Sequence, residues 1–171
     1  PKLYLKYYGH LAKLCDMHHK SLDYQRKVLQ PWVLRLGMWR RLPSVAFWGM
    51  RITQLTGERC SVLIPFTWFT KNPFKSIYFG ALSGGAELST GALCEMMIIG
   101  KGNFSMLVTG FRAEFVKKAT TNVTFTCDQG NELSSVLDQM TNAGDTGTLE
   151  MVATGHNIHG ELIGKAYIQW S

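Results

Sequence analysis

The longest apolar stretch of the chain lies near its middle, between Ile77 and Ile99. Its length approaches the roughly twenty apolar residues that a membrane span needs, but Glu87 near its centre would be costly to place in lipid as a charge. In a water-soluble protein, a helix that is apolar on every side is covered on every side. The pattern therefore predicts a central buried helix around which the rest of the chain is arranged.

One face of this helix is expected to carry polar groups. Ser83, Glu87, Thr90 and Cys94 follow the i, i+4, i+7, i+11 spacing that aligns side chains along a helix. Glutamate is almost never fully buried unless it is paired, and burial raises the pKa of a carboxyl toward the range useful for acid–base chemistry. Glu87 is therefore either a catalytic group, or a structural one bonded to a backbone or serine partner or to its own mate across a dimer interface.

The segments on either side of the helix have the two-residue period of strands, joined by turn-forming residues. Thr120 to Cys127 alternates most clearly, with Val123, Phe125 and Cys127 on one face. A short amphipathic helix is expected at 133–140 from the spacing of its apolar residues. The strands are expected at 45–55, 59–66, 104–116, 120–127, 148–156 and 161–170.

These elements predict an α+β fold. An antiparallel sheet with one apolar face has to cover it, and the central helix is the only long element apolar enough to do so. The sheet is expected to curl around that helix. Residues 1–44 are expected to form an interrupted helical extension with breaks near Pro31, Gly37 and Pro43. The whole chain, 1–171, is interpreted as one domain with its core at 45–171.

Composition limits the classes of function. The chain has 171 residues, of which 46% are hydrophobic and 18% charged, so a folded domain is expected rather than a disordered one. The net charge of +6 favours anionic partners. The four cysteines have no CxxC spacing, and the adjacent His18 and His19 point to different helix faces, so no metal site is expected. We expect a cytoplasmic protein with reduced thiols, because no signal segment is recognisable.

The segment from Arg26 to Arg41 combines basic and aromatic residues without any acid. Two interpretations are open. Trp32 and Trp39 pack a short helix onto the domain while the basic side chains stay solvated, which we favour, or the segment lies on an anionic membrane surface. Nucleic-acid binding is not expected, because only charge supports it and no recognised binding motif is present.

The residues from Asn72 to Gly91 carry a family resemblance. Asn72 is followed by Tyr78-Phe79-Gly80 at the start of the predicted helix and then by Glu87 inside it. This arrangement resembles the Asn, His-Gly-Gly and acidic signature of hotdog-fold acyl thioesterases, specifically the phenylacetate-pathway-like group and the thioesterase-like family labelled DUF4442. The segment 112–119 also resembles a strand and basic turn of that family. The resemblance covers roughly residues 45–171.

The resemblance implies a function and assigns roles. Glu87 would activate water or attack directly, Asn72 would orient water or the carbonyl, and the N–H groups of Phe79 and Gly80 would stabilise the oxyanion. The remaining expected substrate contacts are Tyr78, Ser83, Thr90, Arg112, Lys117 and Lys118, the last three toward the phosphates of coenzyme A or an acidic carrier protein. No metal or cofactor is implied, since coenzyme A enters only as part of the substrate.

The resemblance also implies a homodimer, with further pairing into tetramers left open, because hotdog active sites usually form between two subunits. Tyr78 and Phe79 depart from the family's His-Gly-Gly turn. Two functions therefore stay open at this point. The first is hydrolysis of an acyl-CoA or acyl-carrier-protein thioester. The second is a noncatalytic hotdog module that binds acyl-CoA, acyl chains or a carrier protein.

Overall fold

The computed structural model describes residues 19–171, so the expectations for residues 1–18, His18 among them, lie outside the described residues. A helix at 19–28 precedes the first labelled element. The elements that follow, in order, are α2 (Pro31–Arg41), α3 (Pro43–Trp48), β1 (Arg51–Leu55), β2 (Cys60–Ile64), α4 (Phe79–Ile98), β3 (Val108–Phe115), β4 (Val123–Cys127), α5 (Gly130–Gln139), β5 (Leu149–Asn157) and β6 (Leu162–Trp170).

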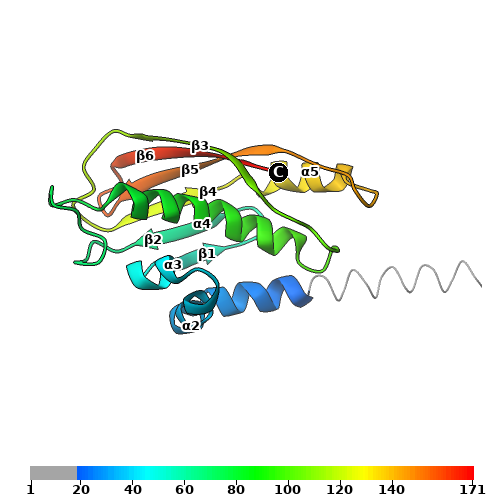
Figure 1. The fold of residues 1–171 in the computed structure, drawn as a ribbon, viewed down its shortest axis with the longest axis horizontal. Coiled ribbons are helices and arrows are strands. Elements are labelled where there is room, and N and C mark those ends of the chain that lie inside the picture. Colours follow the sequence, from blue (N-terminus) through cyan, green and yellow to red (C-terminus); the bar gives the residue numbers. More distant parts are fainter. Residues whose placement is uncertain (1–18) are drawn as a thin grey trace, which may run out of the picture.

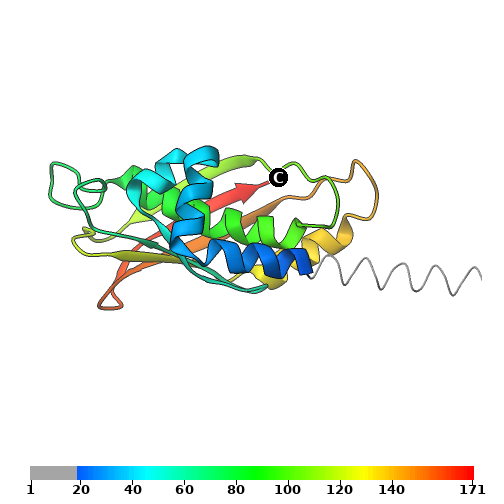
Figure 2. The same cartoon turned by 90° about the horizontal axis from the view of Figure 1, so that it is seen from below.

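The six strands form one sheet in the order β1-β2-β4-β5-β6-β3, and every neighbouring pair is antiparallel. The sheet curls over α4, while residues 19–28, α2 and α3 lie on the opposite side of that helix (Figure 1). The view from below shows these N-terminal helices in front of α4 (Figure 2). The predicted α+β architecture, a curled antiparallel sheet around one central helix with extra N-terminal helices, is confirmed.

Small residues on α4 allow the sheet to approach the helix closely. Ala81 and Ala86 are fully buried, and a side chain at Gly85 would collide with Ile64 on β2. The glycines weaken the helix when it is considered alone, but packing offsets this loss because interiors are filled to crystal-like density. The predicted buried helix is thus confirmed, and the burial of its small face explains why so many of its residues are Gly or Ala.

The prediction of a strand from Val45 onward is wrong for its first half. Residues Pro43–Trp48 form the helix α3, and the strand β1 starts only at Arg51. Pro43 occupies the first helical turn, where its missing N–H costs nothing. Gly49 then ends the helix in the left-handed conformation at φ 69°. The helix-starting Pro43 and the helix-ending Gly49 outweigh the extended pattern between them. The helix α3 therefore crosses the boundary that the sequence predicted between the N-terminal extension, 1–44, and the core, 45–171.

The later elements agree well with the sequence pattern. In β4, Val123, Phe125 and Cys127 are fully buried and alternate with half-buried threonines. The amphipathic helix exists as α5, with Leu133 and Leu137 buried. The strand expected at 104–116 is shorter, since β3 begins at Val108. The alternating pattern of a sheet with one buried face was therefore the most dependable signal in this half of the chain.

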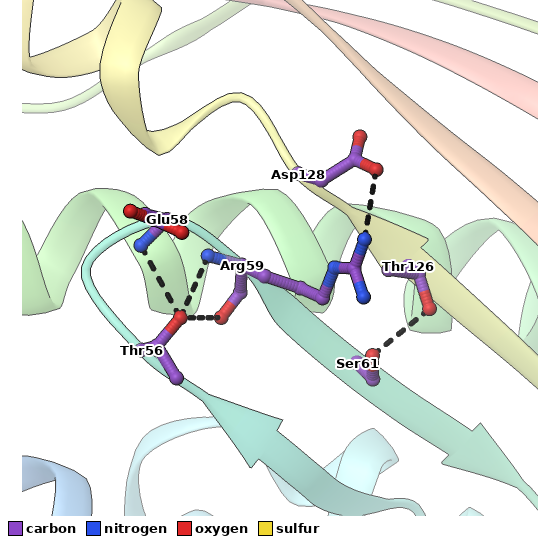
Figure 3. Close-up of polar contacts among 6 residues, drawn as sticks. All are labelled: Thr56, Glu58, Arg59, Ser61, Thr126 and Asp128. Carbon is purple, nitrogen blue, oxygen red and sulfur yellow. Dashed lines mark hydrogen bonds and ion pairs between the residues drawn. The ribbon is translucent and has the colours of Figure 1, made fainter.

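The turn between β1 and β2 is held by a threonine side chain, as Figure 3 shows. The Thr56 hydroxyl accepts hydrogen bonds from the N–H groups of Glu58 at 3.3 Å and Arg59 at 3.1 Å. The Arg59 guanidinium pairs with Asp128 at 3.3 Å, which links the turn to the chain that leads into α5. The predicted hairpin turn is confirmed, and it also supports α5, because the Gly130 N–H donates to the Glu58 carbonyl at 3.0 Å.

The expected packing of the two tryptophans near the N-terminus is wrong. Trp32 is 69% exposed and Trp39 is 51% exposed. α2 contacts the domain mainly through the buried Leu34 on its other side. The two tryptophans lie on the outward side because i and i+7 residues share one face of a helix, and that face is not the face of Leu34.

Two glycine substitutions test the packing of α4. Gly85→Ala should lower the free energy of unfolding by about 1–3 kcal/mol, because the new methyl group overpacks the contact with Ile64. Gly37→Ala on α2 is the matched control, since nothing lies within 4 Å of a Cβ there. It should raise the stability by up to about 1 kcal/mol through helix propensity alone. Urea denaturation measures both, and equal effects of the two substitutions would contradict the packing argument.

Candidate active site

The first turn of α4 offers free backbone donors. Tyr78 is the N-cap residue in an extended conformation, and no side chain caps the helix. Within residues 19–171, the N–H groups of Phe79 and Gly80 have no hydrogen-bond partner. Unpaired N–H groups and the positive end of the helix dipole attract negative charge. The structure therefore shows at this position the two donors that the sequence assigned to an oxyanion.

Aromatic rings surround these donors. The Tyr78 ring lies over Gly80, so that any side chain there would collide with it. The rings of Tyr78 and Phe79 meet edge to face, with their centroids 4.8 Å apart, and both side chains are exposed, Phe79 by 60%. Glycine at position 80 thus leaves room for the tyrosine ring in this position, and the exposed aromatic rings form an apolar surface beside the helix start.

Asn72 organises the loop before α4. Its side-chain carbonyl accepts hydrogen bonds from the Ser76 N–H at 3.1 Å and the Ser76 hydroxyl at 3.3 Å. The loop includes Lys75 at φ 61°, a conformation that is uncommon for residues other than glycine. The side-chain oxygen of Asn72 therefore holds a tight turn, and its role in orienting water or a carbonyl stays a prediction.

Glu87 lies further along α4 and faces a cavity. The cavity has a volume of about 650 Å³ and lies between α4 and the N-terminal helices, with Glu87 in its wall. Among the described residues, no hydrogen bond or ion pair engages the Glu87 carboxylate. Burial raises the pKa of this carboxyl above its ordinary value of 4.5. The structure thus presents a half-buried, unpaired carboxylate, and it contains no serine or backbone partner for the structural alternative.

The helix start and Glu87 are separated within one chain. Glu87 follows Gly80 by seven positions, which is about 10 Å along the axis at a rise of about 1.5 Å per residue. Glu87 lines the cavity, whereas Phe79 and Gly80 do not. Within this chain, the predicted oxyanion donors and the predicted base therefore do not lie at one common pocket.

Thr90, another polar residue of the Glu87 stripe, is hydrogen-bonded inside the domain. The Thr90 hydroxyl donates to the Glu87 carbonyl at 2.9 Å and accepts from the indole N–H of Trp170 at 3.0 Å. Thr90 is fully buried, while Ser83 is half-buried. Thr90 connects the helix to the last strand, and it does not line the cavity.

The residues predicted to contact phosphates lie on β3 and just after it, at the edge of the sheet opposite β1. Arg112 on β3 pairs with Glu114, and its guanidinium lies 3.7 Å from the centre of the Tyr167 ring. Lys117 pairs with Glu161 at 2.5 Å, and Lys118 is exposed. Ion pairs this exposed contribute little to stability. None of the three basic residues lines the cavity beside Glu87.

Sequence reasoning missed Glu95, which lines the cavity and links α4 to the N-terminal helices. One of its oxygens accepts a hydrogen bond from the Tyr24 hydroxyl at 3.0 Å, and the other lies 3.4 Å from the Arg41 guanidinium. Glu95 follows Glu87 by eight positions, so the i, i+4, i+8 spacing would have placed it on the same side of the helix. Its partners come from residues 19–28 and α2, and no local pattern indicates that contact.

Solved structures resemble this fold. A protein of unknown function from Pseudomonas aeruginosa, named a probable thioesterase, superimposes with a TM-score of 0.67 at 17% identity, over 84% of this chain and 96% of that one. A thioesterase from Haemophilus influenzae gives a TM-score of 0.59 at 13% identity, over 80% of this chain and 86% of that one. A protein of unknown function from Chlorobaculum tepidum gives a TM-score of 0.64 at 17% identity, over 84% of this chain and 96% of that one.

At these identities the likeness shows the fold alone, which is the hotdog fold of thioesterase-like proteins. The sequence adds the family. The profile described as "Domain of unknown function (DUF4442)" matches residues 31–171, and the chain belongs to that family. No curated protein matches the chain. Within residues 19–171, no helix combines the length and apolar character needed to cross a membrane.

The missing partner of Glu87 predicts how pH affects stability. Because the pKa of Glu87 is raised in the folded state, the folded state holds a proton that the unfolded chain releases above pH 4.5. The free energy of unfolding therefore falls as pH rises through the interval between the two pKa values. Glu87→Gln lacks this loss, so it should be more stable than the wild type at about pH 8, with the difference vanishing near about pH 4.

Glu95→Gln is the matched control, two helical turns along the same face. It removes a charge bonded to Tyr24 and Arg41, so it should lower the stability at about pH 8. Urea denaturation at both pH values measures the two variants. A loss of stability in Glu87→Gln at about pH 8 would show that its carboxylate has a stabilising partner.

Proposed function

We propose that the protein hydrolyses acyl thioesters at a site shared by two subunits. Glu87 of one subunit serves as the general base or nucleophile, and the N–H groups of Phe79 and Gly80 of the other bind the oxyanion. The observation that carries the proposal is the combination of an unpaired, half-buried carboxylate with two unpaired N–H groups at a helix start, separated by about 10 Å along α4. A second subunit supplies what one chain lacks.

An exposed strand edge supports the dimer. β3 pairs only with β6 within the described chain, so its other edge has free N–H and C=O groups. The strand carries the exposed Phe111 and Phe115, and Leu107 and Val116 beside it are exposed as well. A long apolar edge strand invites pairing with another chain. Two copies of β3 in antiparallel register would join the sheets into one and cover these side chains.

The chemistry follows from the two groups. Attack of water on the thioester carbonyl places negative charge on its oxygen, and the two N–H groups at the positive end of the α4 dipole stabilise that charge. The Glu87 carboxylate accepts the proton of the attacking water, and collapse of the intermediate expels the thiolate. The reaction then needs the ionised form of Glu87, so its rate should rise with pH through the raised pKa and level off above it.

The carrier of the acyl group is coenzyme A or an acidic carrier protein in this proposal. The net charge of +6 supports an anionic carrier. Arg112, Lys117 and Lys118 stay candidates for contact with its phosphates, since exposed ion pairs exchange partners at little cost. No cofactor is required.

Phe79→Pro tests the oxyanion donor cleanly. Phe79 is the first residue of α4, and proline is well tolerated at that position while it removes the N–H group. Loss of one donor should reduce kcat by about 10²–10³-fold. Phe79→Ala is the matched control, because it removes the ring and keeps the N–H. A thiol-release assay against acyl-CoA substrates of several lengths, with Glu87→Gln alongside, measures the effect.

Mixing two inactive variants tests the shared site. When Glu87→Gln and Phe79→Pro chains are unfolded and refolded together, each mixed dimer regains one intact site. The mixture should recover up to about a quarter of the wild-type activity. Recovery of nothing from mixed dimers that sedimentation shows to be present would place both groups in one subunit. Acyl-CoA binding without turnover by the wild type would instead favour the noncatalytic binding module.

A further inference from the structure

The cavity under the N-terminal helices is a second feature of the Glu87 site. Resting on the proposed function, we propose that this cavity holds the acyl chain of the substrate, with the thioester end at Glu87 and an extended aliphatic tail beneath α2. The substrate class is then a medium- or long-chain acyl thioester. A volume of about 650 Å³ lies within the range of about 300–1,000 Å³ found for small-molecule sites.

The lining of the cavity is suited to a hydrocarbon. Most of the lining surface is apolar, although charged residues also border the cavity. The apolar residues come from the N-terminal helices, from α4 and from the end of β6, and include Val28, Leu34, Met38, Leu88, Ala92 and Trp170. On α4 the wall continues from Glu87 along i+1, i+4, i+5 and i+8, which is one helical face. A chain that starts at Glu87 and runs toward the C-terminal end of α4 therefore lies against Leu88, Gly91 and Ala92 before it reaches Glu95.

Several other polar groups that line the cavity have partners among the described residues. Glu95 is bonded to Tyr24 and Arg41, and Lys27 pairs with Asp23 at 2.6 Å. The Glu87 carboxylate has none among the described residues. A reactive polar group is thus expected next to Glu87 and not along the tail, because an unpaired buried polar group is costly and a paired one needs no ligand.

The roof of the cavity is fixed in place. Besides the bonds of Glu95, the Ser21 hydroxyl donates to the Met96 carbonyl at 2.8 Å, and the Gln25 amide donates to the Leu55 carbonyl at 2.5 Å. These contacts hold the helix at 19–28 against α4 and β1. The cavity is therefore a formed space, as expected of small-molecule sites.

Binding to a hydrolysis-deficient variant tests the proposal. Acetyl-, octanoyl- and dodecanoyl-CoA are titrated calorimetrically into full-length Glu87→Gln. The affinity should rise by up to about fourfold per added methylene until the cavity is full. Equal affinity for the three ligands would overturn the proposal. Hydrolysis by the wild type is measured separately, so that chain selectivity without turnover rejects the proposed function alone, and turnover without chain selectivity rejects the acyl cavity alone.

Neighbouring positions on α2 provide a matched pair of cavity variants. Gly37 lines the cavity and has open space at its Cβ, whereas Leu36 is exposed and does not line it. In the Glu87→Gln background, Gly37→Phe should lower the affinity for dodecanoyl-CoA at least tenfold and leave the affinity for acetyl-CoA unchanged. Leu36→Phe should change neither affinity. Ala92→Phe narrows the cavity from α4 as a second test. No effect of either filling variant on the long chain, in folded protein, would overturn the proposal.

The outer face of α2 independently carries a second proposal. Trp32, Leu36 and Trp39 are exposed, Leu36 by 69%, and follow the i, i+4, i+7 spacing of one face. Arg35 and Arg40 flank them and pair with no carboxylate among the described residues. The helix thus presents one face to the cavity and a second apolar face to solvent.

We infer that this outer face docks on an anionic lipid surface. Charge complementarity selects that occupant, because Arg35 and Arg40 beside this face have no carboxylate partner among the described residues and the segment from Arg26 to Arg41 contains no acid. Tryptophan with its apolar ring and N–H group favours the boundary between headgroups and acyl chains. The α2 helix would lie in the plane of the surface, with Leu34 and the cavity behind it.

Cosedimentation with vesicles tests the docking. The full-length protein should bind vesicles of one-third phosphatidylserine in phosphatidylcholine, and bind pure phosphatidylcholine at least tenfold more weakly. Arg35→Glu with Arg40→Glu should reduce binding by at least about 30-fold, and Trp32→Ala with Trp39→Ala by at least tenfold. Lys165→Glu and Trp68→Ala, exposed residues on β6 and on the loop after β2, are the controls. Unchanged binding in the α2 variants, or loss of a dimer in them, would overturn the proposal.

Discussion

The need to cover α4 on every side is the constraint on which this structure depends. Its small residues allow the sheet to pack closely against one side of the helix, as the contact between Gly85 and Ile64 shows. The N-terminal helices cover the other side, but they do not fill the space completely. The part left open is the cavity, and Glu87 lies in its wall. The hydrophobic core and the candidate site are thus two outcomes of packing around the same helix.

Position along α4 separates two kinds of polar group. At the start of the helix, backbone N–H groups are left over because no side chain caps it. Near the middle, Glu87 lies where burial disfavours its charge. Both features reduce the stability of the folded chain, and both are features that the proposed thioester hydrolysis would use. Functional sites commonly retain groups of this kind at a cost in stability.

Much of the architecture follows from local patterns. The central helix, the alternation of β4 and the turn at Thr56 were predictable, because apolar periodicity and turn residues fix them locally. The helix at Pro43–Trp48 was not predicted, since its extended pattern conflicts with the stronger signals of Pro43 and Gly49. The position of Glu87 inside the central helix was also predictable, because Glu87 interrupts the apolar stretch that forms the helix.

The features that were not predictable depend on contacts between distant segments. The cavity exists only because residues 19–28 and α2 lie across α4, and Glu95 finds Tyr24 and Arg41 only in that arrangement. The exposure of Trp32 depends on which face of α2 packs against the domain. Because α2 has two apolar faces, the sequence does not show which of them is buried. The distance between the helix start and Glu87 was computable from the helical rise, and it becomes meaningful once the cavity shows which way Glu87 faces.

The pairing of β3 with β6 has a consequence for synthesis on the ribosome. β3 ends at Phe115, but its partner strand begins at Leu162 and ends at Trp170. At about 5–20 residues per second, several seconds pass between the appearance of the two strands. During that time α4 has emerged while half of the sheet that covers it is missing. The chain therefore acquires its core late and all at once, and a nascent chain stalled before the last strand would expose its most apolar helix to chaperones.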